Sequence, residues 1–227
     1  MTKIIGHRGA AGLALENSLA SIRAALKLPI DGIELDVRRT EDGQLVLMHD
    51  FDIGRVASNA GWVEHTTLKE LRALRLINGE PIPTLEEAFR LIGNKKLIDI
   101  DIKSTGMVRE LLHLLKAYPK VRVVCSGRRY TELYKLHLAR PDIPIILQHH
   151  YDPFYIVHRA KRLGASGICV NMWLMNPITY YQAKRQGLII YAYTINRPWL
   201  LGWFKRLYPS AWIISNHPER LVEDHGR

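Results

Sequence analysis

The stretch Gly32-Ile-Glu-Leu-Asp-Val-Arg38 alternates apolar and charged residues over a length typical of one β-strand. Successive side chains of a strand point to opposite faces, so one face is apolar and the other carries Glu34, Asp36 and Arg38. Two carboxylates on one face repel each other, and they are costly to bury unless a cation joins them. The stretch alone therefore predicts either a cation site or a solvent-facing edge with salt bridges.

A second stretch, Leu97-Ile-Asp-Ile-Asp-Ile-Lys103, repeats this pattern, with three isoleucines on one face and Asp99, Asp101 and Lys103 on the other. Hard divalent cations such as Mg²⁺ and Ca²⁺ prefer carboxylate oxygens. Two independent strands with acids on the inner face favour a metal site over a surface edge. Asp101 and Lys103 fall at the end of the strand, whereas Asp99 lies deeper and is assigned a structural role.

The two stretches belong to a series of Ile-, Val- and Leu-rich runs, most of them followed by a helical pattern. The predicted strands are Lys3–His7, Gly32–Arg38, Lys96–Lys103, Arg122–Ser126, Ile143–Gln148, Gly167–Val170, Leu188–Tyr193 and Trp212–Ser215, with Leu45–His49 as a further strand. The predicted helices are Ser18–Leu28, with Asn17 or Ser18 as its N-cap, Thr84–Gly93, Gly106–Tyr118, Arg129–Arg140, Asp152–Leu163, Pro177–Arg185, Pro198–Tyr208 and Pro218–Asp224.

Eight strands alternating with eight helices predict an α/β protein, a compact TIM (β/α)8 barrel, with an open doubly wound sheet as the alternative. One stretch, Asp50–Pro83, is too long for an ordinary connection and is interpreted as an insertion near the active face. No linker or repeat suggests a second domain, so residues 1–227 are expected to form a single one.

Composition is that of a globular protein, with 47% hydrophobic and 24% charged residues. The two cysteines, Cys125 and Cys169, lie in apolar stretches and are predicted to be buried free thiols of a reducing compartment. Their spacing does not fit structural zinc. No secretory segment precedes Gly6, and no apolar run approaches the roughly 20 residues of a membrane span. A cytoplasmic protein is expected.

The formal net charge of +10 attracts anionic partners, whether nucleic acid, an acidic membrane surface or small phosphorylated molecules. The basic residues are scattered and match no nucleic-acid-binding motif, so we expect no nucleic acid partner. Two aromatic stretches, Met172–Met175 and Trp199–Arg206, fit either a lipid-facing surface or packing within the outer helix layer. Packing of Trp199 and Trp203 in that layer is the favoured interpretation, with weak peripheral contact to an anionic membrane as the alternative.

Two histidines, His7 and His49, each end a predicted apolar strand, which makes them acid–base candidates at one face of the barrel. Arg8 offers a planar fork suited to phosphate oxygens. Glu16 falls on the same loop as His7, just outside the next helix. Gly9 fits either a close approach to a ligand or a simple turn.

Taken in order, these residues resemble the bacterial glycerophosphodiester phosphodiesterases, whose barrel is like that of the phosphatidylinositol phosphodiesterases. The matching motifs are His7-Arg8-Gly9, Glu16-Asn17-Ser18, Glu34-Leu-Asp36, Thr40-Glu-Asp42-Gly, Val46, His49-Asp50, Pro83-Thr84-Leu85, Ile100-Asp-Ile-Lys103, Tyr191-Ala-Tyr-Thr-Ile-Asn196 and Ile213-Ile-Ser-Asn-His-Pro218. They span essentially the whole chain; the N-terminal block is specific and the later matches are looser.

The resemblance implies a TIM barrel that hydrolyses glycerophosphodiesters to an alcohol and sn-glycerol 3-phosphate, in lipid and glycerol metabolism. It implies one divalent cation, Mg²⁺ or Ca²⁺, held by Glu34, Asp36 and Asp101, with His7 and His49 as the general acid and base in an order left open. A small-molecule phosphodiester and no obligate protein partner are expected.

The resemblance further implies that Arg8 and Lys103 neutralise the phosphate and that Glu16 orients the site or reaches the ligand. The chain departs from the family where Asp101 replaces a common glutamate, which affects metal binding. Other departures are expected to affect substrate fit, at Ser18, at Tyr193 and at Ser215-Asn216. A lysophospholipase D at a membrane surface, and a non-enzymatic barrel that binds nucleic acid or phosphate, are the alternatives.

Overall fold

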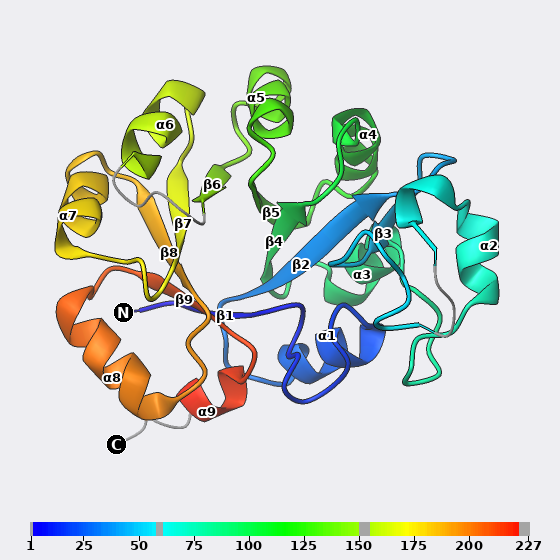
Figure 1. Cartoon of the computed structure of the whole chain (residues 1–227), viewed down its shortest axis with the longest axis horizontal. Helices are drawn as coiled ribbons and strands as arrows, with labels where there is room; N and C mark the ends of the chain where they lie inside the picture. Colours follow the sequence, from blue (N-terminus) through cyan, green and yellow to red (C-terminus); the bar gives the residue numbers. More distant parts are fainter. Residues whose placement is uncertain (1, 58–60, 150–154, 223–227) are drawn as a thin grey trace.

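Eight parallel strands close into a barrel in the computed structural model, which describes residues 2–57, 61–149 and 155–222 (Figure 1). The strands are β1 (Ile4–Gly6), β2 (Gly32–Arg39), β4 (Leu97–Ile102), β5 (Arg122–Gly127), β6 (Ile145–His149), β7 (Gly167–Asn171), β8 (Ile189–Tyr193) and β9 (Trp212–Ser215). Because β1 pairs with both β2 and β9, the sheet has no free edge among these strands. The predicted TIM barrel is confirmed, and the open sheet is excluded.

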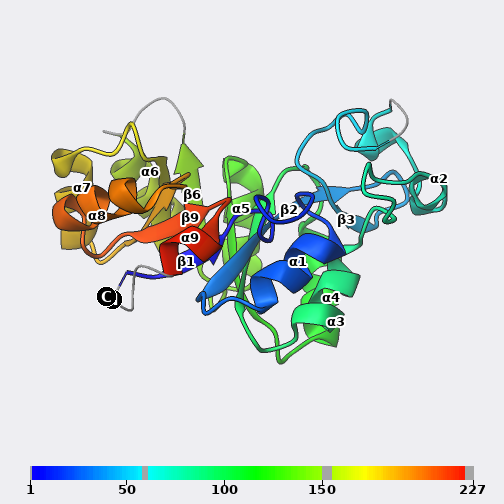
Figure 2. The same cartoon turned by 90° about the horizontal axis from the view of Figure 1, so that it is seen from below.

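Helices surround the barrel on its outer side (Figures 1 and 2). They are α1 (Leu19–Leu26), α3 (Leu85–Ile92), α4 (Val108–Ala117), α5 (Tyr130–Ala139), α6 (Ile156–Leu163), α7 (Pro177–Arg185), α8 (Pro198–Leu207) and α9 (Pro218–Val222). The predicted start of α6 at Asp152 and the predicted end of α9 at Asp224 lie outside the described residues. Among the helices that are described, none is both long and apolar enough to span a membrane.

Local signals fix where these helices begin. The Ser18 hydroxyl accepts a hydrogen bond from the Ser21 amide and caps α1, so of the two predicted caps the serine is the one used. Thr84 forms a capping box with Glu87 at the start of α3, and Asn176 caps α7 ahead of a proline. The caps of α1 and α7 end the loops that leave β1 and β7, whereas Thr84 ends the segment that follows α2.

The stretch predicted as an insertion lies between a short ninth strand, β3 (Leu45–Leu47), and α3. β3 pairs antiparallel with the end of β2. The stretch contains a 3-10 helix, η1 (Val63–His65), and α2 (Leu68–Ala73), which sequence analysis did not predict. A small apolar cluster of its own supports it, and in both figures it lies on the side of the barrel away from α7 and α8.

Apolar side chains form two layers around the strands. The larger layer lies between strands and helices and includes the outward faces of β2 and β4, such as Ile33, Leu35 and Ile100. A smaller cluster fills the barrel interior, with Val124, Cys169 and Tyr191 among its members. Both cysteines are buried and unbridged, as predicted. The charged faces of β2 and β4 therefore point into the barrel, at the carboxyl ends of the strands.

Candidate active site

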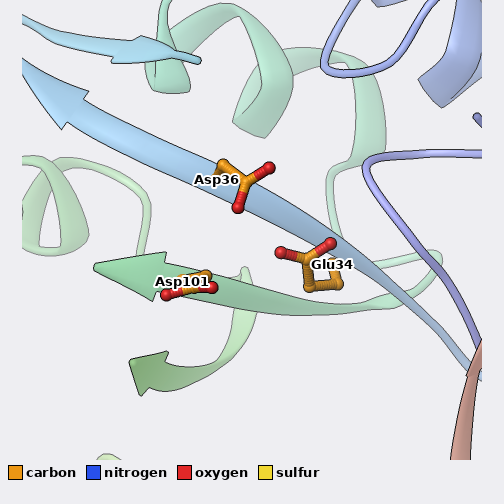
Figure 3. Close-up of side chains that lie close together, drawn as sticks. All are labelled: Glu34, Asp36 and Asp101. Carbon is orange, nitrogen blue, oxygen red and sulfur yellow. The ribbon is translucent and has the colours of Figure 1, made fainter. Parts of the chain in front are cut away.

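Three carboxylates meet inside the barrel mouth, Glu34 and Asp36 from β2 and Asp101 from β4 (Figure 3). All three are buried, and one oxygen of each lies within 4.8 Å of the others. The parallel register of the two strands sets Asp36 directly opposite Asp101. The structure thus brings together the three residues that the family resemblance implied as metal ligands.

Positive groups surround the carboxylates. The Nζ of Lys103 lies 2.9 Å from Asp36 Oδ1 and 2.5 Å from Asp101 Oδ2. The Nε of Arg8 lies 3.1 Å from Asp36 Oδ2, and the backbone N–H of Arg8 donates to Glu34 Oε2 at 2.8 Å. These contacts compensate part of the cost of burying three acids.

The negative charge that these contacts leave uncompensated changes the pKa values of the carboxylates. Burial, together with the neighbouring carboxylates of Asp36 and Asp101, raises the pKa of Glu34 well above its ordinary value. Burial acts to raise the pKa of Asp36 too, but Lys103 and Arg8 outweigh it and hold that pKa below the ordinary range. Asp101 Oδ1 is buried without a hydrogen-bond partner. Three buried carboxylates that raise the pKa of Glu34 and leave one oxygen unpartnered fit one more cation, and an all-oxygen set could hold a hard divalent metal.

Asp99, the deeper acid of β4, takes no part in this cluster. Both of its oxygens are buried without a hydrogen-bond partner, and burial raises its pKa to about 8. The expectation that Asp99 lies below the site is met by its place among Val124, Cys169 and Tyr191 in the barrel interior.

The loop between β1 and α1 contacts the carboxylate cluster through hydrogen bonds to Asp36. Asn17, with a left-handed φ of 54°, donates from Nδ2 to Asp36 Oδ2 at 2.8 Å and accepts from the Asp36 amide at 3.1 Å. Gly9 has φ of 91°, and a Cβ there would lie 2.3 Å from Ser21 Oγ, so glycine is required for loop packing against α1. Sequence reasoning missed the role of Asn17; its only signal was an amide in a motif that also offers a cap.

His7 and His49 line one cavity of about 170 Å³ together with Arg8, Glu34, Asp101 and Lys103. His7 Nδ1 lies 2.5 Å from Asn216 Oδ1, and its Nε2 lies 3.8 Å from Glu34 Oε2. Burial, and then the positive charge of Arg8, lowers the pKa of His7. His49 Nδ1 lies 2.6 Å from Asp50 Oδ1. The two histidines therefore differ in their partners, one an amide and the other a carboxylate.

At two of the positions that depart from the family pattern, Ser18 and Asn216, the side chains make contacts within the protein. Sequence analysis assigns Ser18 and Ser215-Asn216 to substrate fit, but Ser18 caps α1 and Asn216 holds His7. Neither serine is among the residues that line the cavity. Tyr193 does line it, so the expectation of a role in substrate fit stands for that residue.

A chain of ion pairs joins the loops that carry the two histidines. Arg8 Nη1 donates to Glu16 Oε1 at 2.8 Å, and Arg55 donates to both oxygens of Glu16. Arg55 also donates to Asp50, the partner of His49. Glu16 thus contacts Arg8 and Arg55 and is not among the residues that line the cavity. No pattern in the sequence indicated a role for Arg55, which comes from the insertion.

The far wall of the cavity comes from β5 to β9 and bears few charges. It includes Ser126, Arg128, Gln148, Cys169, Tyr193, Thr194 and Ile214. A larger cavity of about 710 Å³ lies outside the barrel between β3, α2, α3 and α4. Its arginines are paired with its glutamates, as Arg39 is with Glu110 and Arg72 with Glu87, so we place the chemistry in the smaller one.

A closed (β/α)8 barrel with buried carboxylates and two histidines at its strand ends defines an enzyme of the TIM-barrel type. A family model described as the glycerophosphoryl diester phosphodiesterase family matches residues 7–220, and the chain belongs to this family. It is therefore an enzyme of the phosphodiester-hydrolysing class, which sets aside the non-enzymatic alternative.

Curated relatives carry the name of the same family, and solved structures share the fold. The chain is 32% identical to a glycerophosphodiester phosphodiesterase of Caldanaerobacter subterraneus subsp. tengcongensis, over 97% of this chain and 96% of that protein. It is 29% identical to human glycerophosphodiester phosphodiesterase 1, over 97% of this chain and 74% of that one. In structure it resembles a phosphodiesterase from Oleispira antarctica in complex with the product sn-glycerol-3-phosphate, with a TM-score of 0.93, 24% identity and coverage of 100% and 98%.

Proposed function

We propose that this enzyme hydrolyses glycerophosphodiesters to an alcohol and sn-glycerol 3-phosphate, using one divalent cation at Glu34, Asp36 and Asp101. The observation that carries the proposal is the meeting of these three buried carboxylates beside two histidines in one cavity. The bound sn-glycerol-3-phosphate of the Oleispira antarctica enzyme supports the product. Residues 1–227 would act as one catalytic domain with an insertion at about 50–83, and the buried free thiols favour a cytoplasmic setting.

The donor set favours Mg²⁺ or Ca²⁺, because all its ligand atoms are carboxylate oxygens. When bound, the cation draws negative charge from the phosphate oxygens. The Arg8 guanidinium and the Lys103 ammonium line the same cavity and would neutralise the phosphate further. Glu16, through its ion pair with Arg8, would orient the guanidinium towards the substrate.

The different partners of the two histidines suggest their roles. The Asn216 carbonyl oxygen accepts from His7 Nδ1–H, which leaves Nε2 as an acceptor facing the cavity, and the lowered pKa of His7 favours its neutral form. His7 would therefore take the proton of the attacking hydroxyl group, of water or of the glycerol moiety. His49 Nδ1 contacts the Asp50 carboxylate, which orients the ring, and His49 would protonate the departing alcohol oxygen.

The proposal is tested by assaying the purified enzyme on glycerophosphocholine and related diesters, with and without a chelator. We expect a chelator to abolish hydrolysis and Mg²⁺ or Ca²⁺ to restore it. Glu34→Gln should abolish the response to metal, whereas Glu86→Gln, at a surface pair with Arg90, should behave as wild type. Full activity in the chelator would contradict the metal site, and no activity on any glycerophosphodiester would contradict the substrate.

A second activity, that of a lysophospholipase D, is favoured by the exposed tryptophans Trp173 and Trp199, which follow the strands β7 and β8 that help to form the cavity. Lysophosphatidylcholine and glycerophosphocholine present the same phosphodiester with and without an acyl chain. Their relative kcat/KM values distinguish the two activities, since a lysophospholipase D prefers the acylated substrate.

A further inference from the structure

The net positive charge of this protein is concentrated in one part of the chain, because that part lacks acidic residues. Residues 153–218 contain eight lysines and arginines and no aspartate or glutamate, so they account for +8 of the formal net charge of +10. This segment forms α6, α7 and α8 with their strands, and the three helices lie side by side in both views of the molecule (Figures 1 and 2). The rest of the chain is close to neutral.

The same helices expose large aromatic side chains. Trp173 is 75% exposed in the loop before α7, and Trp199 and Trp203, one turn apart on α8, are 65% and 53% exposed. The favoured expectation that the last two pack within the helix layer is wrong. The core-facing side of α8 is already filled by Leu200, Leu201 and Phe204.

We call this surface the aromatic–basic face and define it by nine exposed residues of α7, of α8 and of the loops that precede these two helices. Its members are Trp173, Ile178, Tyr181, Lys184, Arg185, Arg197, Trp199, Trp203 and Arg206. Within the described parts of the chain, no carboxylate lies within ion-pair distance of the four basic residues Lys184, Arg185, Arg197 and Arg206. The cations are thus available to an external anion.

From this face we propose that the enzyme docks on anionic phospholipid membranes, with the tryptophans at the level of the lipid headgroups. Tryptophan rings prefer the membrane–water interface, because they combine a large apolar surface with one N–H donor. Lysines and arginines beside them are attracted to acidic headgroups. Aromatic and basic groups without acids are what such a surface attracts, and the combination occurs here on neighbouring helices.

A second copy of the chain fits this face less well. In a two-fold contact the same patch lies on both subunits, so the cations of one copy would oppose those of the other with no acids between them. An anionic lipid surface supplies the missing negative charge. Charge complementarity therefore favours the membrane.

The position of the aromatic–basic face on the barrel determines how the docked enzyme would be oriented on the membrane. Trp173 follows β7 and Arg197 follows β8, so both lie past the carboxyl ends of strands, on the side where the cavity opens. Docking would hold the cavity mouth close to the headgroups. The contact uses none of the carboxylates or histidines of the proposed mechanism, so it stands or falls separately from them.

Vesicle flotation of the full chain tests the proposal. We expect it to float with vesicles of phosphatidylcholine plus phosphatidylglycerol and not with phosphatidylcholine alone, and high salt should reduce the binding. Equal binding to both vesicle types, or none to the anionic ones, would overturn the proposal. If hydrolysis of soluble glycerophosphocholine persists while flotation fails, the docking surface is lost and the proposed function remains.

Matched variants locate the contact. Trp203→Ala should lower the partition coefficient at least about tenfold, whereas Trp62→Ala, a 54% exposed tryptophan in the insertion beside η1, should leave it unchanged. The pair Arg197→Gln with Arg206→Gln should lower it about 30-fold, at about 1 kcal/mol per charge. The control pair Lys116→Gln with Lys120→Gln changes the net charge equally at exposed positions at the end of α4 and beyond it, and should have a much smaller effect.

Soluble hydrolysis should be unchanged in all these variants, which shows that they fold. Equal losses from Trp62→Ala and Trp203→Ala would overturn the assignment of the face. So would a solution dimer that Trp203→Ala dissociates, which would make the face an interface between copies. Binding to nucleic acid that the same variants abolish, without vesicle binding, would overturn it as well.

Discussion

The half of the barrel from β1 to β4 and the half from β6 to β9 carry their charges in different places. In the first half the charges are buried at the strand ends, where Glu34, Asp36, Asp101, Arg8 and Lys103 contact one another. In the second half the strand ends contribute an almost uncharged wall, and the positive charge lies on the outer helices.

The two halves are therefore under different physical constraints. Buried acids need fixed partners, and the first half provides them through loop contacts such as those of Asn17 and Arg55. Exposed cations need no fixed partner, and within the described residues no carboxylate lies within ion-pair distance of Lys184, Arg185, Arg197 or Arg206 in the second half. We therefore expect substitutions at buried polar positions of the first half to affect catalysis or metal binding, and similar substitutions in the second half to spare both.

The largest effect is expected from the histidines. His7→Ala or His49→Ala should lower kcat on glycerophosphocholine about 10²- to 10⁴-fold, because each removes one proton transfer. His158→Ala, an exposed histidine on α6 in the second half, is the matched control and should keep normal turnover. Circular dichroism should show all three folded. Near-normal activity in either of the first two variants would remove the acid–base assignment.

The next effect concerns stability and pH. Asp99 has a folded-state pKa of about 8, above its unfolded value, so the folded state holds its proton more tightly. Its contribution is then full at low pH and is lost as the pH rises, at about 1.4 kcal/mol per pH unit between about pH 4 and pH 8. Asp99→Asn should reduce this slope in the metal-free protein, measured as the free energy of unfolding in urea with a chelator, and the slope that remains is expected from Glu34, whose pKa is also raised.

The exposed Asp142 serves as the control for that measurement. Its pKa is lowered by the hydrogen bond from Arg140, so its titration lies at lower pH. Asp142→Asn should leave the slope above about pH 5 unchanged. A slope that is unchanged in Asp99→Asn would show that Asp99 does not contribute to it.

A smaller effect is expected at Asn17, which holds Asp36 through two hydrogen bonds. Asn17→Ala should weaken binding of Mg²⁺ or Ca²⁺ about 10- to 100-fold, since residues that orient metal ligands have effects of this size. Titration calorimetry measures it. Asn176→Ala, which removes the cap of α7 in the second half, should cost about 1 kcal/mol of stability and leave the metal affinity unchanged. Equal metal affinities in the two variants would contradict the division between the halves.

The smallest effect is expected at Arg55, which is half exposed and joins Glu16 to Asp50. Arg55→Met should lower kcat by less than about tenfold, because exposed ion pairs contribute little and water can replace them. Arg140→Met, which breaks a surface pair with Asp142, is the control and should not change kcat. A loss as large as that of a histidine variant would make Arg55 a direct participant.

Strand alternation made much of the fold and the centre of the site predictable. A period of two put Glu34 with Asp36, and Asp101 with Lys103, on the inner faces, and barrel closure then brought the two strands together. The exposed tryptophans of α8 were predictable too, because Trp199 and Trp203 lie opposite Leu200, Leu201 and Phe204 on a helix of 3.6 residues per turn. Their expected packing in the helix layer rested on the usual burial of tryptophan, whereas the phase of α8 turns both side chains away from the core.

The contacts that hold the histidines and the loops of the site could not be predicted from the sequence. Asn216 meets His7 across 209 positions of the chain, and Arg55 meets Glu16 across 39. Such pairs depend on loop conformations, including the left-handed backbone of Arg8 and Asn17, which no periodicity encodes. A single sequence fixes which faces are charged, but it does not fix which loop atom meets them.

The ammonium of Lys103 lies between Asp36 and Asp101 and affects the order of folding and metal binding. A built-in counter-ion lets the barrel close before any metal arrives, so assembly need not wait for loading. We expect the newly folded apoenzyme to be a stable species that acquires its cation late and can exchange one ion for another without unfolding. A single cooperative melting transition of the metal-free protein, with activity returning on addition of metal, is the behaviour that this predicts.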